Sequence, residues 1–366
     1  MKKKICIIVD HPSRDLDGCI LLKVELEKLN FDVSLLSYYF KHEVFINKPN
    51  IIIFPHYREQ FHQLIAIYKK CGIMVAILDT EGGFFPDAPG LEKYINTVQL
   101  SLSKIDLYFL WGNLHKEKLI SKKSPEKNFF VSGHPRYDLL NYKYRSLFKE
   151  EKNNFNKCIL FNTNFPEINP KFQSINKEID NSIKYDGVSR NFINRYNTMR
   201  REQLNNFINV IDKISEYFAD YLIKIRPHPF ESFDPYMKIK KKNLIIDNKK
   251  TIIHDLMNAD AVIQNMCHTA FEAFIVENYA INLSFLNNEY FQNYYHSKVS
   301  IESNDFNELV EQIKFKIKNQ KYSGQINKSE AKKIIKDFFY MSDGNASKRI
   351  AQKINETYQE KYKNKD

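Results

Sequence analysis

The segment from Ile223 to Phe230, Ile-Lys-Ile-Arg-Pro-His-Pro-Phe, is the strongest sign of chemistry in the chain. Proline fixes its own φ and keeps the preceding residue out of the helical region, so His228 should be held rigidly at the end of a strand. Open α/β sheets bind ligands at the carboxyl ends of their strands. A preset imidazole there, with Arg226 beside it, suits a phosphate, although a structural turn that contains a histidine fits the same residues.

A second pattern suited to a phosphate lies in residues 258–272, where a strand-like run leads into a helical one that offers Asn265, His268 and Thr269. A helix start presents unpaired N–H groups and the positive end of the helix dipole, so it can bind an anion. Thr269 could donate its hydroxyl to a phosphate. The alternative is that Thr269 and Glu272 form a capping box that starts the helix.

A candidate general base lies in Asp79-Thr-Glu-Gly-Gly83, directly after a strand-like run. Glu81 stands immediately before the glycines, and Gly82 lets the backbone turn sharply and approach a ligand closely. A carboxylate in this place can accept a proton from a substrate. The alternative is an acidic turn that caps the next helix.

Three further polar residues follow expected strands. Asn164 comes after the strand near 158–162 and could reach the same ligand as His228. Arg14 and Asp15 come just after the first strand, where a contact with an acceptor substrate is one option. Acidity at the start of a helix, which complements the helix dipole, is the other.

Strand-like and helical runs alternate along the chain, which is typical of doubly wound parallel sheets. A lysine-, asparagine- and tyrosine-rich stretch near residues 141–157 indicates a domain boundary. The expected architecture is two Rossmann-like α/β domains, residues 1–150 and 151–340, that face each other across a cleft, with a C-terminal helix and basic tail at 341–366. Strands are expected at 4–9, 32–37, 50–55, 74–78, 107–111, 129–131, 158–162, 221–225, 244–246, 261–264 and 280–285. Helices are expected at 16–29, 60–70, 90–103, 191–218, 306–318, 330–338 and 346–358.

Composition fits a globular protein, since 366 residues with 43% hydrophobic content can bury two cores. No apolar run is long enough to span a bilayer, and the start of the chain lacks the pattern of a signal peptide, so a cytoplasmic location is expected. The net charge of +11 could reflect solvated lysines or attraction to an anionic membrane surface. No nucleic-acid-binding motif is present.

No metal is expected at the site. The cysteines are scattered without a CxxC pair, and no HxxxH or HExxH spacing occurs among the histidines. The Asp-x-Asp at Asp15 to Asp17 lies where a helix should begin, so its acidity is interpreted as helix-start acidity.

Six motifs together resemble bacterial surface carbohydrate biosynthesis proteins, a group that looks like inverting GT-B glycosyltransferases. They are also similar to the acidic-Gly, His-Pro and Ser/Thr motifs of bacterial sialyl-, polysialyl- and Kdo-transferases, which use CMP-sugars. The resemblance covers roughly residues 1 to 290, and the motifs occur in the order seen in that group. The motifs are Asp79-Thr-Glu-Gly-Gly83, Phe109-Leu-Trp-Gly112, Val131-Ser-Gly-His-Pro-Arg-Tyr-Asp138, Ile159-Leu-Phe-Asn-Thr-Asn-Phe165, Ile225-Arg-Pro-His-Pro229 and Ile263-Gln-Asn-Met-Cys-His-Thr-Ala-Phe-Glu-Ala273.

The resemblance implies that Glu81 deprotonates the acceptor hydroxyl and that His228 binds the departing CMP phosphate. Thr269, with Asn265 nearby, would hold that phosphate at the helix start. The sequence departs from the common form at Thr80, where many members have a second carboxylate, and at His134, where asparagine is frequent. The full donor-side set is Arg226, Asn164, Asn265, His268, Thr269 and Glu272, and the acceptor-side set is Arg14, Asp15 and Gly82.

The expected function is therefore metal-independent transfer of an acidic sugar, such as Kdo or a sialic, legionaminic or pseudaminic acid, from a CMP-sugar to a surface glycan. Displacement at an anomeric carbon needs a base on the attacking oxygen and charge neutralisation on the leaving phosphate. If the acceptor is lipid-linked, the basic C-terminal region would help to hold the enzyme at the inner membrane face. A CDP-glycerol-type phosphotransferase, a sugar-nucleotide epimerase and a non-catalytic scaffold remain alternatives.

Overall fold

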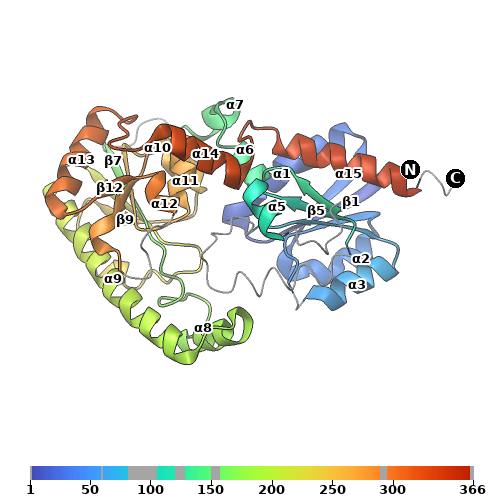
Figure 1. Ribbon diagram of the computed structural model, residues 1–366, viewed down its shortest axis with the longest axis horizontal. Coiled ribbons are helices and arrows are strands. Elements are labelled where there is room, and N and C mark those ends of the chain that lie inside the picture. Colours follow the sequence, from blue (N-terminus) through green and yellow to red (C-terminus); the bar gives the residue numbers. More distant parts are fainter. Residues whose placement is uncertain are drawn as a thin grey trace. The chain divides into compact units, whose positions relative to one another are not determined.

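The computed structural model describes residues 2–58, 61–80, 105–119, 128–149, 157–288 and 295–362. The chain forms two compact units, the first from residues 1–144 and 334–366 and the second from residues 145–333. Each unit is built on one six-stranded parallel sheet (Figure 1). The expected fold class of two doubly wound α/β domains is therefore confirmed.

The first sheet has the strand order β2-β1-β3-β4-β5-β6, and all its pairings are parallel. Most of its strand residues are buried apolar side chains, as expected where helices cover both faces of a parallel sheet. The order reverses at β1, because β2 lies on one side of it and β3 on the other. The strands are β1 (Lys3–Val9), β2 (Phe31–Ser37), β3 (Ile51–Phe54), β4 (Met74–Leu78), β5 (Leu107–Leu110) and β6 (Phe129–Val131).

One face of the first sheet packs against α1 (Pro12–Lys28) and α15 (Ala346–Tyr362), which lie side by side (Figure 1). The other face packs against α3 (His62–Lys70). The buried carboxylate of Asp138 accepts hydrogen bonds from the amides of Ala346 and Ser347 at 2.8 and 2.7 Å, and so caps the start of α15. The C-terminal helix is therefore an integral part of the first unit.

The second sheet has the strand order β12-β11-β10-β7-β8-β9, again entirely parallel. The order reverses at β7, which has β8 on one side and β10 on the other. The strands are β7 (Cys158–Asn162), β8 (Leu222–Arg226), β9 (Leu244–Ile246), β10 (Ala261–Gln264), β11 (Ile281–Leu283) and β12 (Ile301–Ser303).

The longest helix of the second unit, α9 (Arg190–Tyr217), begins at a Ser189 cap and packs its buried face on the sheet. The Phe207 ring meets that of Phe161 on β7 edge to face, with the ring centroids 6.0 Å apart. The other helices are α2 (Val44–Asn47), α5 (Asn113–Leu119), α6 (Pro135–Asp138), α7 (Tyr142–Arg145), α8 (Ile175–Asn181), α10 (Ile252–Asn258), α11 (Thr269–Ile275), α12 (Tyr295–Lys298), α13 (Phe306–Lys318) and α14 (Lys328–Phe339), with short turns at η1 (Tyr38–Glu43), η5 (Ser146–Phe148), η6 (Ser182–Asp186), η7 (Tyr236–Lys238) and η8 (Ser284–Leu286).

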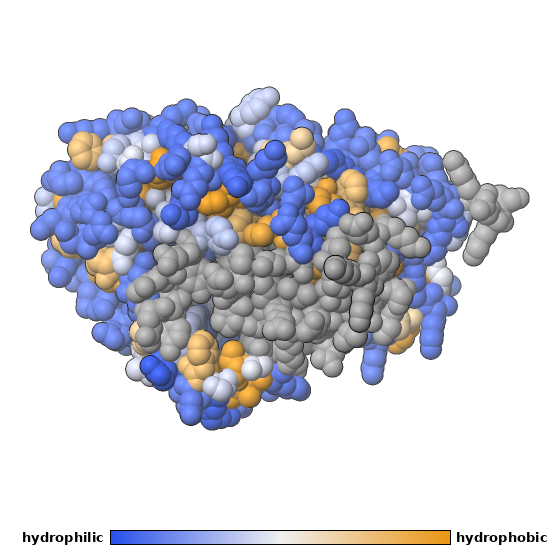
Figure 2. Space-filling view, in the orientation of Figure 1, coloured by the Kyte–Doolittle hydropathy of each residue, from blue (hydrophilic) through white to orange (hydrophobic). Residues whose placement is uncertain are grey.

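The unit boundaries differ from the expected domains. The first boundary falls at 144/145 rather than 150/151, and the chain returns to the first unit at 334 rather than leaving a separate segment at 341–366. The short strand β12 was not expected, and the expected helix at 90–103 lies outside the described residues. Hydrophilic side chains cover most of the described surface on the face seen in Figure 2, in keeping with the charge content.

Candidate functional site

The donor-side candidates gather after neighbouring strands of the second sheet. Asn164 follows β7, His228 follows β8, and Asn265 follows β10. The sheet places these three strands side by side with β7 in the middle, so their carboxyl ends share one edge. The reversal of strand order next to β7 is where an open α/β sheet leaves a crevice for a ligand.

His228 is half-buried, and hydrogen bonds fix both its backbone and its ring. Its N–H donates to Thr163 Oγ1 at 3.3 Å, and its Nδ1 accepts the N–H of Phe230 at 3.3 Å. Because Nδ1 is an acceptor here, the neutral ring carries its proton on Nε2. The imidazole can thus donate from Nε2 to an oxyanion, as the expected phosphate contact requires.

A buried carboxylate lies beneath this turn. Glu231 Oε1 accepts the Thr163 hydroxyl at 2.8 Å and the Phe165 amide at 2.7 Å, and its Oε2 accepts the Tyr236 hydroxyl at 2.6 Å. We call these four residues the Glu231 network. It joins the loop after β7 to the loop after β8, because Thr163 also accepts the N–H of His228.

Asn164 and Asn265 are held by side chains of α9. Arg200 donates to the Asn164 carbonyl, and Gln203 donates to Asn265 Oδ1 at 2.6 Å. The Asn164 amide in turn donates to the Met266 carbonyl at 3.2 Å, across the reversal between β7 and β10. Asn265 is buried and also bonds to the loop after β11, so the structure gives it a positioning role.

Arg226 has a partner inside the unit. Its Nη1 lies 2.8 Å from Asp255 Oδ2, and Lys224 Nζ lies 2.7 Å from the other carboxylate oxygen. Burial raises the pKa of Asp255, but the His254 hydrogen bond and the two cations outweigh it and lower that pKa overall. The expected contact of Arg226 with phosphate stays a prediction.

The capping box considered for α11 does not form. The helix is capped by His268, which has helical φ and ψ and makes no side-chain cap, and Thr269 is the first helical residue. Within the part of the chain that the structure describes, the buried Thr269 hydroxyl has no hydrogen-bond partner. Glu272 is buried one turn into the helix.

On the acceptor side, Glu81 and Gly82 lie outside the described residues, so their expected roles remain predictions. The two residues before them are held firmly. Asp79 accepts the Tyr108 hydroxyl on its carboxylate at 2.5 Å and the Trp111 indole N–H on its carbonyl at 2.6 Å, and the Thr80 amide donates to the Pro55 carbonyl at 3.0 Å.

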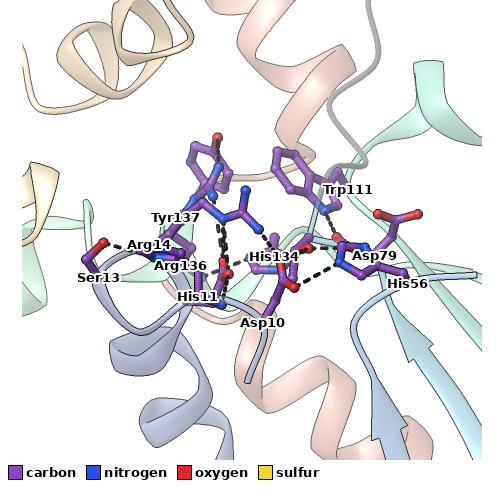
Figure 3. Close-up of polar contacts among 12 residues, drawn as sticks. Asp10, His11, Ser13, Arg14, His56, Asp79, Trp111, His134, Arg136 and Tyr137 are labelled. Carbon is purple, nitrogen blue, oxygen red and sulfur yellow. Dashed lines mark hydrogen bonds and ion pairs between the residues drawn. The ribbon is translucent and has the colours of Figure 1, made fainter. Parts of the chain in front are cut away.

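An unexpected pair lies at the reversal of the first sheet (Figure 3). Asp10 follows β1 and His56 follows β3, and Asp10 Oδ1 lies 3.0 Å from His56 Nε2. Thr80 Oγ1, after β4, lies 3.4 Å from Asp10 Oδ2 and 3.5 Å from His56 Nδ1. We call Asp10, His56 and Thr80 the acceptor-edge network.

Arg14 and Asp15 lie at the start of α1, and Figure 3 shows Arg14 next to this network. Arg14 Nη2 lies 2.5 Å from Asp10 Oδ2, and its Nε lies 3.0 Å from Asp15 Oδ2. The buried carboxylate of Asp15 also accepts the N–H of His11 at 3.1 Å. Asp15 therefore helps to start the helix, the alternative left open by the sequence, and the acceptor contacts of both residues are untested.

His134 has a structural place. Its Nδ1 accepts the Arg136 amide at 3.2 Å and thereby caps α6. Burial, with the charges of Arg136 and Arg14, holds the pKa of His134 well below its usual range, so the ring is neutral. A cavity of about 10 Å³ beside it, lined also by Asp15 and Thr80, is close to the smallest that holds one water.

No protein-family model matches this chain. No curated protein matches it in sequence. Solved structures do match it. UDP-GlcNAc 2-epimerase of Methanocaldococcus jannaschii, in complex with UDP-GlcNAc and UDP, is similar at a TM-score of 0.58 and 16% identity, over 96% of this chain and 99% of that one.

The similarity extends to UDP-GlcNAc 2-epimerase of Neisseria meningitidis, at a TM-score of 0.55 and 12% identity over 96% of this chain and 100% of that one. A variant of the wall teichoic acid polymerase TagF is similar at a TM-score of 0.62 and 12% identity, over 98% of this chain and 90% of that one. The chain has the GT-B-like two-domain fold of these enzymes. At such low identity the comparison establishes the fold alone, so the CMP-sugar part of the expected function is still a prediction.

Across the described ranges, no helix is both long and apolar enough to cross a membrane. In the same ranges, no three His, Cys, Asp or Glu side chains gather as a metal site would need. Metal independence and attachment to a membrane surface both stay predictions.

Asp10 and His56 are the residues that the sequence reasoning missed. A place after an expected strand, which pointed to Glu81, applies to them too, since Asp10 follows the expected strand 4–9 and His56 follows the expected strand 50–55. His56 even follows a proline, Pro55, but it lacks the second proline that marks His228, and Asp10 has no glycine beside it as Glu81 does.

Proposed function

We propose that the protein is an inverting, metal-independent glycosyltransferase of surface glycan synthesis. It transfers an acidic sugar of the Kdo, sialic, legionaminic or pseudaminic type from a CMP-sugar to a glycan acceptor. The proposal is supported by a fold that is similar to enzymes solved with UDP-GlcNAc and UDP, and by the motifs that resemble CMP-sugar transferases.

The observation that carries the proposal is the placement of His228. Its ring lies at the carboxyl edge of the second sheet, beside the reversal at β7, and its Nδ1 is occupied by the Phe230 amide. Nε2–H is then the donor of the neutral ring, and a phosphate contact would use it. A leaving CMP phosphate gains negative charge as the glycosidic bond breaks, and a positioned donor stabilises that charge.

The proposed reaction is a single displacement. The acceptor hydroxyl oxygen bonds to the anomeric carbon from the face opposite the leaving group, and its proton passes to a base at the first sheet's carboxyl edge, for which Glu81 is the sequence's candidate. The bond from the anomeric carbon to the phosphate oxygen breaks with its electron pair, so CMP leaves. Inversion at the anomeric carbon follows.

A CDP-glycerol-type phosphotransferase is the second candidate, favoured by the similarity to TagF. Both reactions release CMP, but only the phosphotransferase leaves a phosphate in the product. If the acceptor is lipid-linked, the basic C-terminal region would hold either enzyme at an anionic membrane surface, which vesicle sedimentation with and without anionic lipid tests.

The first test is calorimetric titration of the protein with CMP, CDP, UDP and GDP in the presence of EDTA. We expect selective binding of CMP, and His228→Ala should weaken it about 10–100-fold, the usual effect of losing a hydrogen bond to a charged group. His42→Ala, at an exposed histidine of the first unit, is the matched control. Tighter binding of UDP would favour an epimerase, and binding of no nucleotide would favour a scaffold.

The second test follows the product. With a CMP-sugar donor and a glycan acceptor, mass spectrometry should find the sugar added without phosphate, and NMR of the product should find an inverted anomeric centre. Glu81→Gln should leave CMP binding intact and abolish transfer, because the amide keeps the shape and removes the basicity. A phosphate-containing product from CDP-glycerol would instead establish the second candidate.

A further inference from the structure

The acceptor-edge network of Asp10, His56 and Thr80 has no role in the mechanism described so far. Its members follow β1, β3 and β4, which are adjacent in the first sheet, so the network spans the reversal of strand order. All three side chains are largely shielded from solvent. A buried Asp–His pair at the ligand-binding edge of a sheet is an arrangement that handles protons in enzymes.

The hydrogen bonds determine which nitrogen of His56 can accept a proton. Burial raises the pKa of Asp10, but the His56 hydrogen bond, the charge that His56 carries when it is protonated and the charge of Arg14 outweigh burial and lower that pKa to about 2. Asp10 is therefore a carboxylate at neutral pH, so it is a hydrogen-bond acceptor only, and it accepts from His56 Nε2–H and, at 3.4 Å, from the Thr80 hydroxyl. Nδ1 of the neutral ring is left with its lone pair, and Thr80 Oγ1 lies 3.5 Å from it.

The surroundings favour a transient positive charge on this ring. The Asp10 carboxylate lies 3.0 Å from Nε2 and would stabilise an imidazolium. Arg14 contacts the other Asp10 oxygen at 2.5 Å, which keeps the carboxylate in place. The rings of Tyr38 and Phe61 pack against the imidazole, with centroids 6.1 and 6.3 Å away, and hold its orientation.

We propose that the acceptor-edge network is a proton relay for the attacking hydroxyl. Thr80 Oγ1 takes the proton of the acceptor hydroxyl while it passes its own proton to His56 Nδ1, and Asp10 stabilises the resulting imidazolium. The acceptor oxygen bonds to the anomeric carbon in the same step, and CMP leaves with the electron pair of the broken bond. The inference rests on the proposed function, and it makes His56 a rival of Glu81 for the same proton.

The test compares His56→Gln, Thr80→Val and Thr80→Ser with the wild-type enzyme. Gln can still bond to Asp10 but is not basic, Val matches the shape of Thr without the hydroxyl, and Ser restores the hydroxyl. We expect His56→Gln and Thr80→Val to lower kcat about 10²-fold or more. The KM for the donor and the affinity for CMP should stay unchanged, and Thr80→Ser should restore most of kcat.

Two outcomes would overturn the relay. If Thr80→Val transfers as fast as the wild type while Glu81→Gln is inactive, the proton goes to Glu81 and the proposed function stands without the relay. If Thr80→Ser is as slow as Thr80→Val, the position needs the shape of threonine and not its hydroxyl. Thermal unfolding of each variant identifies loss of folding, and the Thr80 pair decides the question if His56→Gln does not fold.

The proposed function fails in a different way. Wild-type protein that neither binds CMP nor releases it from any CMP-sugar would remove the transferase itself, whatever the variants do. Wild-type protein that binds CMP selectively and transfers sugar, with normal rates in both His56→Gln and Thr80→Val, would remove the relay alone.

Discussion

Glu231 accepts three hydrogen bonds in the interior of the second unit, from the Thr163 and Tyr236 hydroxyls and the Phe165 amide. Burial raises the pKa of Glu231 from 4.5 to about 6, against the lowering effect of these donors. The folded state therefore binds its proton more tightly than the unfolded state does. The stability that this proton contributes is complete below pH 4.5 and is lost as the pH rises through about 6.

We predict that Glu231→Gln removes this pH dependence, because the amide does not titrate. The wild-type free energy of unfolding should lose about 2 kcal/mol from this group between the two pH values, and the variant should lack that component. Urea unfolding at a series of pH values measures the difference. Glu202→Gln, at an exposed glutamate of α9, is the control and should parallel the wild type.

For single residues, the sequence predicted the position of a side chain at a strand end better than it predicted the hydrogen-bond partner of that side chain. His228 lies where the Pro-His-Pro pattern placed it, at the end of β8. The expected contact of Arg226 with a phosphate stays a prediction, and its bond to Asp255, 29 residues away in the sequence, was not predicted. A pairing between distant side chains depends on how strands and helices pack, and no local pattern in the sequence encodes it.

Between elements, Gly112 controls how closely the turn after β5 approaches α14. A Cβ built on Gly112 would lie 2.2 Å from the Asp337 carbonyl oxygen and 2.5 Å from that of Phe338. These are backbone atoms of the helix, so they cannot move aside without shifting the helix. Any side chain at position 112 would overlap the backbone of α14, so only glycine fits there.

We predict that Gly112→Ala destabilises the first unit by about 1–3 kcal/mol or more, the usual cost of forcing extra volume into a packed interior. Gly72→Ala is the comparison variant, because its Cβ would meet nothing within 4 Å, so it shows the cost of a positive φ of 75° alone, about 1–2 kcal/mol, which Gly112→Ala should exceed. Chemical denaturation of both variants tests the difference. Equal effects would show that close packing at Gly112 is unimportant.

Among the elements, strands with an apolar run were predictable, including the three-residue strands β6 and β9, and β12 was not. The strands 74–78 and 158–162 match β4 and β7 because β-branched and aromatic residues fill a buried strand. The strand β12 spans only Ile301–Ser303, with Glu302 in the middle, so its sequence offers too little apolar pattern. Its place in the sheet comes from pairing with β11.

For the molecule as a whole, the decisive feature is that α15 belongs to the first unit. Ile350, Ile354 and Tyr358 are buried in the core formed with α1 and β1. Burying each such side chain is worth about 1.5–3 kcal/mol. Together they approach the about 5–15 kcal/mol by which a domain is stable.

We predict that a chain ending at residue 344 keeps the second unit folded and loses the first. In hydrogen exchange followed by mass spectrometry, β1 should exchange at nearly the unfolded rate while β7 and β8 stay protected. A chain ending at residue 362 retains α15 and is the control. Protection of β1 in the shorter chain would show that the first unit folds without its last helix.

The sequence predicted a helix at 346–358 but not the surface on which this helix packs. Amphipathic periodicity identifies a helix that needs a partner surface and leaves that surface unspecified. The position of α15 on the first unit depends on Asp138, which bonds to the start of this helix across 208 residues of sequence.

Because the ribosome makes the chain from its N-terminus, the first unit lacks its last helix until synthesis is nearly complete. Ribosomes add about 5–20 residues per second, so about 10–40 s separate the appearance of Asp138 from that of the helix it caps. Meanwhile the second unit, whose residues 145–333 are contiguous, can fold as soon as it has left the exit tunnel. The first unit is begun first and completed last, so its apolar strands must wait with an unfinished core and are the part of the nascent chain that most needs a chaperone.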